Sequence, residues 1–532
     1  MAEQIEGLYY YRPPRARTDE TIDADLIIYG GTSAGVVAAL QASRMGLTVA
    51  IAEITSRLGG MSAGGLGATD IGNKAAIGGI SRSFYRAMGK HYGHDESWGF
   101  EPHVAEGVFQ DWVAESGAAV RFRQYLTDVT VESGRIRQLK MDDGTTYRGR
   151  AFIDATYEGD LLARAGVSFH AGREPNARYH ETLNGIHFGH PNHAFYRWVD
   201  AYNVPGKPDT GLLPCVSDDE PGTPGNGDAC IQAFNFRLAL TDDRSRQLPW
   251  PTPASYDPSR YELLLRYIQA GVWDALDLNK GLANGVTDLN NNGAFSTDHI
   301  GANHDWPVAD WACREEIFQD HVAYQAGLHR FLCTDDRLPE FVREHANKWG
   351  LCSDEFTDTA GWPEQLYIRE SRRMVSNIVM SEKHCRREET VDDPIGMAAY
   401  QMDSHNCRRL VLNGQAVNEG NVEVRPDRPY PISYRAIVPR GEECMNLLVP
   451  VCVSASHIAF GSIRMEPVFM LLGQSAATAA AMALDADTPV QEVDYAKLRE
   501  RLLADGQVLR HDENSPHGDQ SAGDLPGKTP MP

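Results

Sequence analysis

Residues 25–61 read DLIIYGGTSAGVVAALQASRMGLTVAIAEITSRLGGM, and they decide the fold. Residues 25–29 predict a buried strand, 34–45 a helix rich in small residues, and 47–52 a second apolar strand that ends at Glu53. This strand–helix–strand order, with glycines at the first turn, is typical of a unit that binds a dinucleotide. The cofactor class therefore follows from one local stretch of sequence.

Each polar or small residue of this stretch has a physical reason to be there. Gly30 permits the tight turn, and Gly35 lets the helix pack closely on the strand. The free N–H groups at the start of the helix, together with its dipole, attract a pyrophosphate. Glu53 is placed to accept hydrogen bonds from ribose hydroxyls. Thr32 stands where the strict pattern has glycine, so a packed turn without a ligand is the alternative.

A second glycine-rich stretch follows the acid, as SRLGGMSAGGLG over residues 56–67. A nicotinamide dehydrogenase would continue into another strand–helix unit here. A second glycine loop instead suggests a longer cofactor, FAD, which needs further close approach of the backbone. Arg57 could meet a phosphate. A flexible surface loop is the alternative.

Residues 148–167, RGRAFIDATYEGDLLARAGV, predict a strand, an acidic turn and a helix beside the same nucleotide. The preceding residues alternate apolar and polar side chains, with turns at Ser133–Gly134 and Asp143–Gly144, which predicts a β-meander. We expect Val129, on the strand that opens the meander, to contact the adenine.

Residues 446–484 predict a buried strand at 447–453, a polar loop and then a helix that carries Gly473 and Ser475. The small residues would let this helix approach a neighbour closely, and its N-terminus would face the pyrimidine end of a flavin. An ordinary alanine-rich core helix is the alternative.

These blocks together resemble a known family. The motifs are GGTSAG with Glu53, RLGGMSAGGLG, IDATYEGD, IRESRRM, DSHN and FGSIRMEPVFMLLGQSAATAA, and they span about residues 24–484. The chain is similar to the FAD-dependent oxidoreductases of the glutathione-reductase-like superfamily, distantly fumarate-reductase-like. The resemblance implies an α/β chain, α+β overall, in which a Rossmann-type FAD-binding domain with a β-meander is interrupted by an inserted mixed substrate domain.

The implied layout has four parts. The FAD-binding domain would cover residues 21–185 and 430–490, the substrate domain 186–429, and a C-terminal helix with a disordered tail 491–532. The residues expected to hold FAD are Gly30, Thr32, Ser33, Ala34, Gly35, Glu53, Arg57, Gly59, Gly60, Met61, Ser62, Gly65, Val129, Ala155, Thr156, Asp160, Arg464, Gly473 and Ser475.

Flavin chemistry needs a base for the substrate proton. We consider His405, His457 and Tyr434, and each has a purely structural alternative. Arg464 would neutralise the flavin ring or only stabilise the fold.

The arginines of residues 368–374 would bind an anionic substrate or pair with Glu370. Asp288 to Gly293 begins like a calcium loop, but His299 occupies the position that needs a glutamate, so a turn is expected and no metal.

Composition limits the partners. The net charge of −23 argues against nucleic acid. Nine cysteines without a C-x-x-C pair favour a reducing compartment, taken as the cytoplasm. We see no signal peptide and no run of about 20 apolar residues, and so expect no membrane association. The electron acceptor, oxygen or a partner protein, and a homo-oligomeric state are left open.

The leading hypothesis is an FAD-dependent oxidoreductase that oxidises a small polar organic substrate, a secondary alcohol, sugar or amine, by hydride transfer to the flavin. One alternative is a flavin-dependent C=C reductase or desaturase that acts on a carboxylate. The other is a flavoprotein that uses FAD in a non-redox or structural role.

Overall fold

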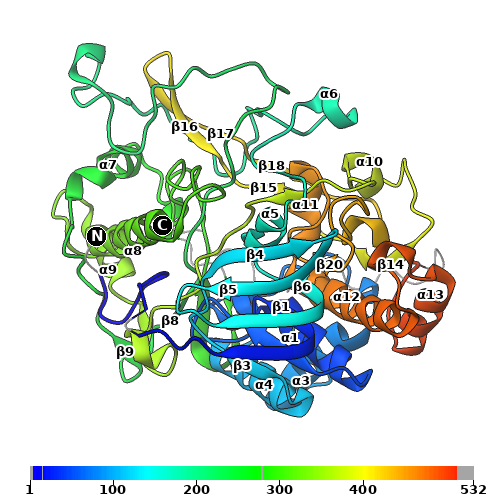
Figure 1. Cartoon of the computed structure of the whole chain (residues 1–532). Coiled ribbons are helices and arrows are strands. Elements are labelled where there is room, and N and C mark those ends of the chain that lie inside the picture. The colour runs from blue at the N-terminus through cyan, green and yellow to red at the C-terminus, as the bar shows by residue number, and fades with distance from the viewer. Residues whose placement is uncertain (1–3, 15, 277–279, 512–532) are drawn as a thin grey trace.

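The computed structural model describes residues 4–14, 16–276 and 280–511. It is a mixed α/β fold built around one seven-stranded sheet, with helices packed against that sheet and smaller antiparallel sheets beside it (Figure 1). This is the fold class that the sequence predicts.

The large sheet combines a parallel part and a meander. Its strand order is β3-β2-β1-β6-β5-β4, and β20 also pairs with β6. The strands β1, β2, β3, β6 and β20 are parallel, whereas β4, β5 and β6 are joined as an antiparallel meander. The bounds are β1 Thr21–Tyr29, β2 Val49–Ala52, β3 Ala119–Arg121, β4 Leu126–Glu132, β5 Arg135–Met141, β6 Thr146–Asp154 and β20 Leu447–Leu448. The Rossmann-type unit and the meander of the prediction are both present.

Two helices far apart in sequence pack face to face. These are α1 (Ser33–Arg44) and α12 (Glu466–Ala486). Gly473 lies at their crossing, where a Cβ atom would overlap the backbone of Ala34. Among the described helices, α12 alone is long and apolar enough to cross a membrane, but it is buried inside the protein. Its apolar character is therefore that of a core helix.

The late part of the chain returns to the first sheet. β20 pairs with β6, so the stretch of residues 446–484 reaches the same sheet as residues 25–61. The strand that we expected over residues 447–453 covers Leu447–Leu448. The domain boundaries given by the sequence stay predictions.

The middle of the chain forms a second, five-stranded sheet with the order β10-β11-β8-β12-β9. Residues 230–241, CIQAFNFRLALT, are apolar enough to predict a strand, and β8 covers the last four of them, Leu238–Thr241. The bounds of the other elements here are β9 Gln247–Leu248, β10 Lys280–Gly281, β11 Val286–Leu289, β12 Gly350–Cys352, α7 Glu262–Gln269, α8 Trp311–Thr334 and α9 Glu340–Ala346. Helical patterns in residues 259–279 and 309–349 correspond to α7 in the first range and to α8 and α9 in the second.

Short hairpins connect this part to the late helices. Strand β15 (Met402–Ser404) pairs with β18 (Val422–Val424) and lies against α11 (His457–Ile463). Gly461 of α11 approaches so closely that a Cβ would lie 2.9 Å from the backbone nitrogen of Asp403. This glycine fixes the position of the DSHN segment.

The last described helix is α13 (Tyr495–Ala504), as predicted for residues 490–506. The predicted disordered tail lies, from residue 512 on, outside the described residues.

Candidate cofactor site and active site

The first glycine turn has the geometry of a dinucleotide site. Gly30 has a φ of 101°, and its N–H donates to the carbonyl of Ala52 at 2.8 Å. A Cβ at Gly35 would overlap the carbonyl oxygen of Gly30, so a side chain there is excluded. Thr32 is the N-cap of α1: its hydroxyl accepts from Gly35 N at 3.3 Å and donates to Ala155 O at 2.7 Å. The departure from glycine at position 32 therefore has a structural use, because the hydroxyl ties the turn to the end of β6.

Glu53 ends β2 directly opposite this turn. Its carboxylate accepts hydrogen bonds from the N–H of Thr55 at 2.6 Å, from the Thr55 hydroxyl at 2.7 Å and from Gly31 N. Burial raises the pKa of Glu53, and these hydrogen bonds and Arg123 act against that rise. A buried acceptor beside the turn is what ribose hydroxyls require.

The second glycine loop folds back onto the first. Gly59 N donates to the carbonyl of Gly31 at 2.8 Å. Gly60 has a φ of 54°, and a Cβ there would overlap the hydroxyl of Tyr157. Met61 N donates to that same hydroxyl at 2.9 Å. The separate glycine turns thus converge in space, as the FAD hypothesis requires.

One carboxylate of α12 contacts both glycine-rich turns and the turn that follows β6. Glu466, in the first turn of α12, accepts from Ser33 Oγ at 2.6 Å, Ser62 Oγ at 2.9 Å and Tyr157 OH at 2.7 Å. Burial raises the pKa of Glu466. Sequence reasoning missed Glu466 and Tyr157. The available signal was an acid in the first turn of an otherwise apolar helix, where the helix dipole favours it.

Two cavities meet at Tyr157. The first is lined by Tyr10, Gly30, Thr32, Glu53, Ile54, Thr55, Thr156, Tyr157, Glu158 and Gln365. The second is lined by Tyr157, Tyr367, Ile368, Arg369, Val451, Phe460, Arg464, Glu466 and Phe469. The first holds the acid, hydroxyls and helix start that suit the adenosine and pyrophosphate of FAD, and the second holds aromatic rings and guanidinium groups that suit a flavin ring. The residues present therefore fit FAD.

A family model for FAD-dependent oxidoreductases matches residues 25–502. The chain belongs to this family. FAD is its cofactor, and it is an oxidoreductase. A comparison with curated proteins found no match.

Solved structures of other flavoproteins are similar over part of the chain. A geranylgeranyl bacteriochlorophyll reductase-like protein from Thermoplasma acidophilum is 18% identical, with 28% of this chain and 43% of that chain covered and a TM-score of 0.21. A mutant flavin monooxygenase from Stenotrophomonas maltophilia is 15% identical, with 29% and 42% covered and a TM-score of 0.21. A 3-ketosteroid-Δ4-(5α)-dehydrogenase from Rhodococcus jostii RHA1 is 15% identical, with 29% and 51% covered and a TM-score of 0.20. The chain spans about half or less of each, so we infer nothing about the substrate from them.

Several residues expected to bind FAD have other partners. The Arg57 guanidinium pairs with Glu106 at 2.6 Å and with Asp358, and its expected phosphate contact stays a prediction. Asp160 pairs with Arg314 at 2.6 Å and Arg372 at 2.6 Å. Although burial opposes ionisation, these arginines hold the pKa of Asp160 well below its usual range. Asp160 therefore forms a buried ionic link from the start of α5 (Asp160–Arg164) to α8 and to Arg372.

The adenine contact expected at Val129 stays a prediction. Val129 lies in the middle of β4, paired with Leu139, three residues beyond the start of the strand. The backbone beside Glu53 belongs to Arg121, whose carbonyl accepts from Glu53 N at 2.8 Å, and to Gln124, whose N–H donates to Glu53 O at 2.9 Å. The segment between β3 and β4 therefore lies next to Glu53.

Three small residues serve packing in the structure. Gly473 packs on Ala34, and Ser475 donates to Ile395 O at 2.9 Å. A Cβ at Gly65 would overlap the carbonyl oxygen of Arg237. Ser475 lies nine residues into α12, about 14 Å along the axis from its start, so it is far from the helix N-terminus that meets Ser33.

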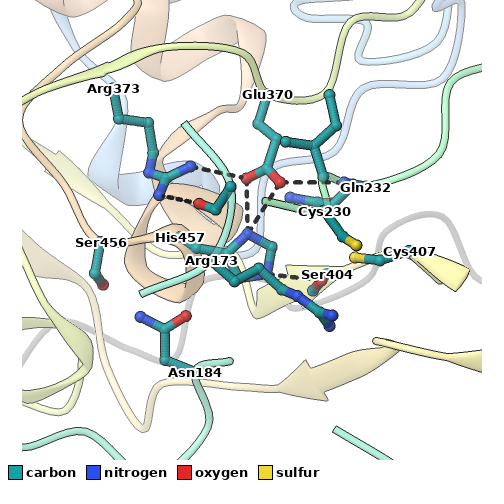
Figure 2. A network of polar contacts seen from close by, with 12 residues as sticks. Arg173, Asn184, Cys230, Gln232, Glu370, Arg373, Ser404, Cys407, Ser456 and His457 are labelled. Carbon is teal, nitrogen blue, oxygen red and sulfur yellow. Dashed lines mark hydrogen bonds and ion pairs between the residues drawn. The ribbon is translucent and has the colours of Figure 1, made fainter. Parts of the chain in front are cut away.

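His457 lies in a closed polar network (Figure 2). Its Nδ1 is 2.7 Å from Glu370 Oε2, and its Nε2 is 3.0 Å from Ser404 Oγ. Arg373 adds a second partner for Glu370 at 3.3 Å. The His457 side chain is 2% exposed, and protein groups engage both ring nitrogens.

His405 is held differently. Its Nδ1 is 2.8 Å from Asp298 Oδ2, whereas its Nε2 is 3.5 Å from Asp403 Oδ2. Its side chain is 12% exposed. Asp298 also pairs with Arg369 at 3.0 Å, and Asp403 with Arg464 at 2.9 Å. Two ion pairs therefore connect His405 to the cavity that Arg369 and Arg464 line.

Tyr434 does not join this group. It begins a 3₁₀ turn after β19 (Tyr430–Ser433), and its hydroxyl donates to the carbonyl of Val490 at 2.6 Å. Burial raises the pKa of Tyr434. Its hydrogen bond stabilises the start of the C-terminal segment, so the structure gives it a packing role instead of the predicted catalytic one.

Three arginines surround the ring of Tyr367, a residue that lines the second cavity. The guanidinium carbons of Arg369, Arg464 and Arg237 lie 4.6, 5.9 and 5.8 Å from the centre of the Tyr367 ring. The Tyr367 hydroxyl accepts from Arg464 Nη1 at 3.1 Å. Sequence reasoning identified Arg369 and Arg464 but missed Tyr367 between them.

Two sets of residues have the ligand types of a cation site. Asp288, the first residue of the calcium-like loop, lies in β11 and pairs with Arg237. Glu101, His103 and Glu355 bring ligand atoms within 4.8 Å of one another. His103 already pairs with Glu355 at 2.7 Å, and Glu101 accepts from Asn284 at 2.7 Å. Protein contacts account for both sets, and we propose no metal site.

Proposed function

We propose that this FAD-dependent oxidoreductase oxidises a small polar organic substrate, a secondary alcohol, sugar or amine, with His405 as the base. The observation that carries the proposal is the His405–Asp298 pair, in which one ring nitrogen is held at 2.8 Å and the other is 3.5 Å from its nearest acid. A histidine general base is commonly held through one ring nitrogen and accepts the substrate proton at the other.

The comparison with His457 supports this choice. A base must be within hydrogen-bond reach of the proton that it removes. Both nitrogens of His457 are engaged by Glu370 and Ser404, and the ring is 2% exposed. His405 Nε2 has a longer contact, 3.5 Å to Asp403 Oδ2, and the His405 side chain is more exposed, at 12%. We therefore assign His457 to positioning of the α11 terminus.

FAD, when bound, supplies hydride acceptance. His405 Nε2 takes the proton from the O–H or N–H group of the substrate. Asp298 accepts a hydrogen bond from Nδ1, which fixes the tautomer and stabilises the positive charge that forms on the ring. Arg369 and Arg464 hold the two acids in place by ion pairs.

A second candidate has its own observation. Arg369 and Arg464 line the same cavity as Glu466 and Tyr157, and guanidinium groups bind carboxylates well. This favours a flavin-dependent C=C reductase or desaturase that acts on a carboxylate. A non-redox, structural use of FAD is the third candidate, and no side-chain arrangement favours it.

Anaerobic flavin reduction tests these candidates. The holoenzyme is mixed with secondary alcohols, sugars, amines and saturated carboxylates, and bleaching of the flavin absorbance is followed. Reduction by alcohols, sugars or amines supports the leading proposal. Reduction by carboxylates alone, or reoxidation of the reduced enzyme by an unsaturated carboxylate, supports the second. A spectrum that no donor or acceptor changes supports the third.

The remaining predictions concern the surroundings of the enzyme. We propose a small-molecule substrate, oxygen or a partner protein as electron acceptor, a reducing compartment such as the cytoplasm, and no binding of nucleic acid or membrane. All nine cysteines are free thiols, which is in keeping with a reducing compartment. The oligomeric state is open, and light scattering of the purified holoenzyme measures it.

A further inference from the structure

The segment Ile5–Tyr11 precedes the family match, which begins at residue 25, yet it is part of the protein interior. Leu8 is fully buried, and Tyr10 is 4% exposed. The segment, dark blue in Figure 1, runs alongside α8 before the chain enters β1. A segment outside the shared fold that is buried this deeply needs an explanation.

Two side chains of α8 hold the backbone of this segment. The Glu315 carboxylate accepts from Tyr10 N at 2.7 Å and from Tyr11 N at 2.8 Å. Gln319 donates to the carbonyl of Leu8 at 2.8 Å. The segment is therefore tied to the middle of the chain by backbone hydrogen bonds.

The Tyr10 ring is fixed by aromatic neighbours. Its centre lies 4.8 Å from Trp306, in an edge-on arrangement, and 5.9 and 6.1 Å from Trp311 and Phe318. Its hydroxyl donates to Glu158 Oε1 at 2.8 Å. Glu158 follows the end of β6, so Tyr10 links α8 to the Rossmann-type sheet.

Tyr10 is also a wall of the cofactor cavity. It lines the same cavity as Gly30, Thr32 and Glu53, the residues of the dinucleotide turn. The preceding residue, Tyr9, packs under the Arg123 guanidinium, which lies 4.2 Å over its ring. Arg123 N in turn donates to the carbonyl of Thr55 at 3.2 Å, two residues from Glu53.

We propose that the segment Ile5–Tyr11 is a strap that retains FAD, with Tyr10 as a cofactor-positioning residue at the dinucleotide turn. A nucleotide seated on that turn has Tyr10 as its neighbour on the side of α8. Its release then requires the strap to separate from Glu158 or from Glu315. The strap therefore acts mainly on the rate at which FAD leaves.

The test measures FAD retention, not turnover. Holoenzyme is diluted, and the rise of flavin fluorescence gives the FAD dissociation rate. Tyr10→Phe removes only the hydroxyl bond to Glu158, and we expect dissociation to be about three- to tenfold faster. Tyr10→Ala also removes the ring, and we expect a larger increase. The control is Leu502→Ala, which truncates a fully buried side chain on α13, remote from the strap.

The melting temperature of each apoprotein separates retention from general stability. Faster FAD release in both Tyr10 variants, with the rate of Leu502→Ala unchanged, supports the strap. An unchanged dissociation rate in Tyr10→Phe overturns the proposal, as does an equal increase in Leu502→Ala. Tyr10→Phe keeps the ring packing, so it keeps the proposal testable should Tyr10→Ala not fold. The result does not depend on the identity of the substrate, so the strap and the proposed oxidation fail or hold separately.

Discussion

Two histidine–carboxylate pairs, His457–Glu370 and His405–Asp298, differ in burial and in the contact of the second ring nitrogen. His457 has Glu370 on one ring nitrogen and Ser404 on the other, and its ring is sealed from solvent (Figure 2). His405 has Asp298 on one nitrogen, and its second nitrogen is 3.5 Å from an acid. Both are histidine–carboxylate pairs, so the proposed assignment depends on the longer contact and greater exposure at the second nitrogen of His405, and not on the pair itself.

The largest expected effect comes from replacing each of the two histidines in turn. We expect His405→Gln to slow anaerobic reduction of the flavin by substrate about 10²- to 10⁴-fold, because a positioned base is lost. His457→Gln is the matched control, and we expect it to lower the melting temperature while the reduction rate stays near the wild-type value. Equal FAD content of both variants, from the absorbance spectrum, is required. A greater loss of rate in His457→Gln would reverse the assignment.

The second largest effect concerns acid stability of the sealed pair. Burial favours the neutral form of Glu370, but the charge and hydrogen bond of His457, together with Arg373, lower the pKa of Glu370 to about 2 from 4.5. The unfolded chain then binds more protons than the folded one between these values, so stability falls as the pH falls from about 4.5 toward 2. Because one pKa unit is about 1.4 kcal/mol, this carboxylate contributes about 3 kcal/mol at neutral pH.

Urea unfolding at a series of pH values measures that contribution. We expect Glu370→Gln to be less stable than wild type at pH 7 and to show a weaker loss of stability below pH 4.5. The control Glu500→Gln removes an exposed carboxylate on α13 and should leave the pH dependence as it is. An unchanged acid profile in Glu370→Gln would mean that other carboxylates dominate acid unfolding.

The same contrast explains what the sequence could predict. The dinucleotide turn is local: Gly30, Gly35 and Glu53 lie within 24 residues, so their spacing alone carries the geometry. The histidine pairs join segments more than 80 residues apart, such as Asp298 with His405. Asp298 lies in a loop without periodicity, so no pattern marks it. Long-range pairing of this kind is set by packing, which local sequence does not encode.

Two features near the dinucleotide turn could not be predicted from the sequence, for the same reason. The meander is confirmed, but the sequence does not mark where β3 ends and β4 begins, so it does not show which residues of this segment lie beside Glu53. Tyr10 was missed because its partners, Glu158 and Glu315, are 148 and 305 residues away. Fold class thus follows from short patterns, whereas the walls of the site follow from contacts between distant segments.

Asp298→Asn tests the role of the acid in the His405–Asp298 pair. The amide keeps the shape but loses the charge that stabilises a positive imidazole and fixes its tautomer. We expect the reduction rate at saturating substrate to fall about 30-fold, equivalent to about 2 kcal/mol, with little change in the substrate concentration for half-maximal rate. An unchanged rate would show that Asp298 serves only its ion pair with Arg369.

Ser404→Ala gives the smallest expected effect and tests the contact of the second ring nitrogen of His457. The substitution leaves His457 Nε2 without its 3.0 Å partner in a buried site, and a lost hydrogen bond of this kind costs about 1 kcal/mol of unfolding free energy. We expect urea unfolding to show this loss and flavin reduction by substrate to be unchanged. Combined with His457→Gln, the loss should be less than additive, because both changes remove the same contact. A slower reduction in Ser404→Ala alone would mean that the sealed network carries protons to the substrate, and the distinction between the two histidines would then disappear.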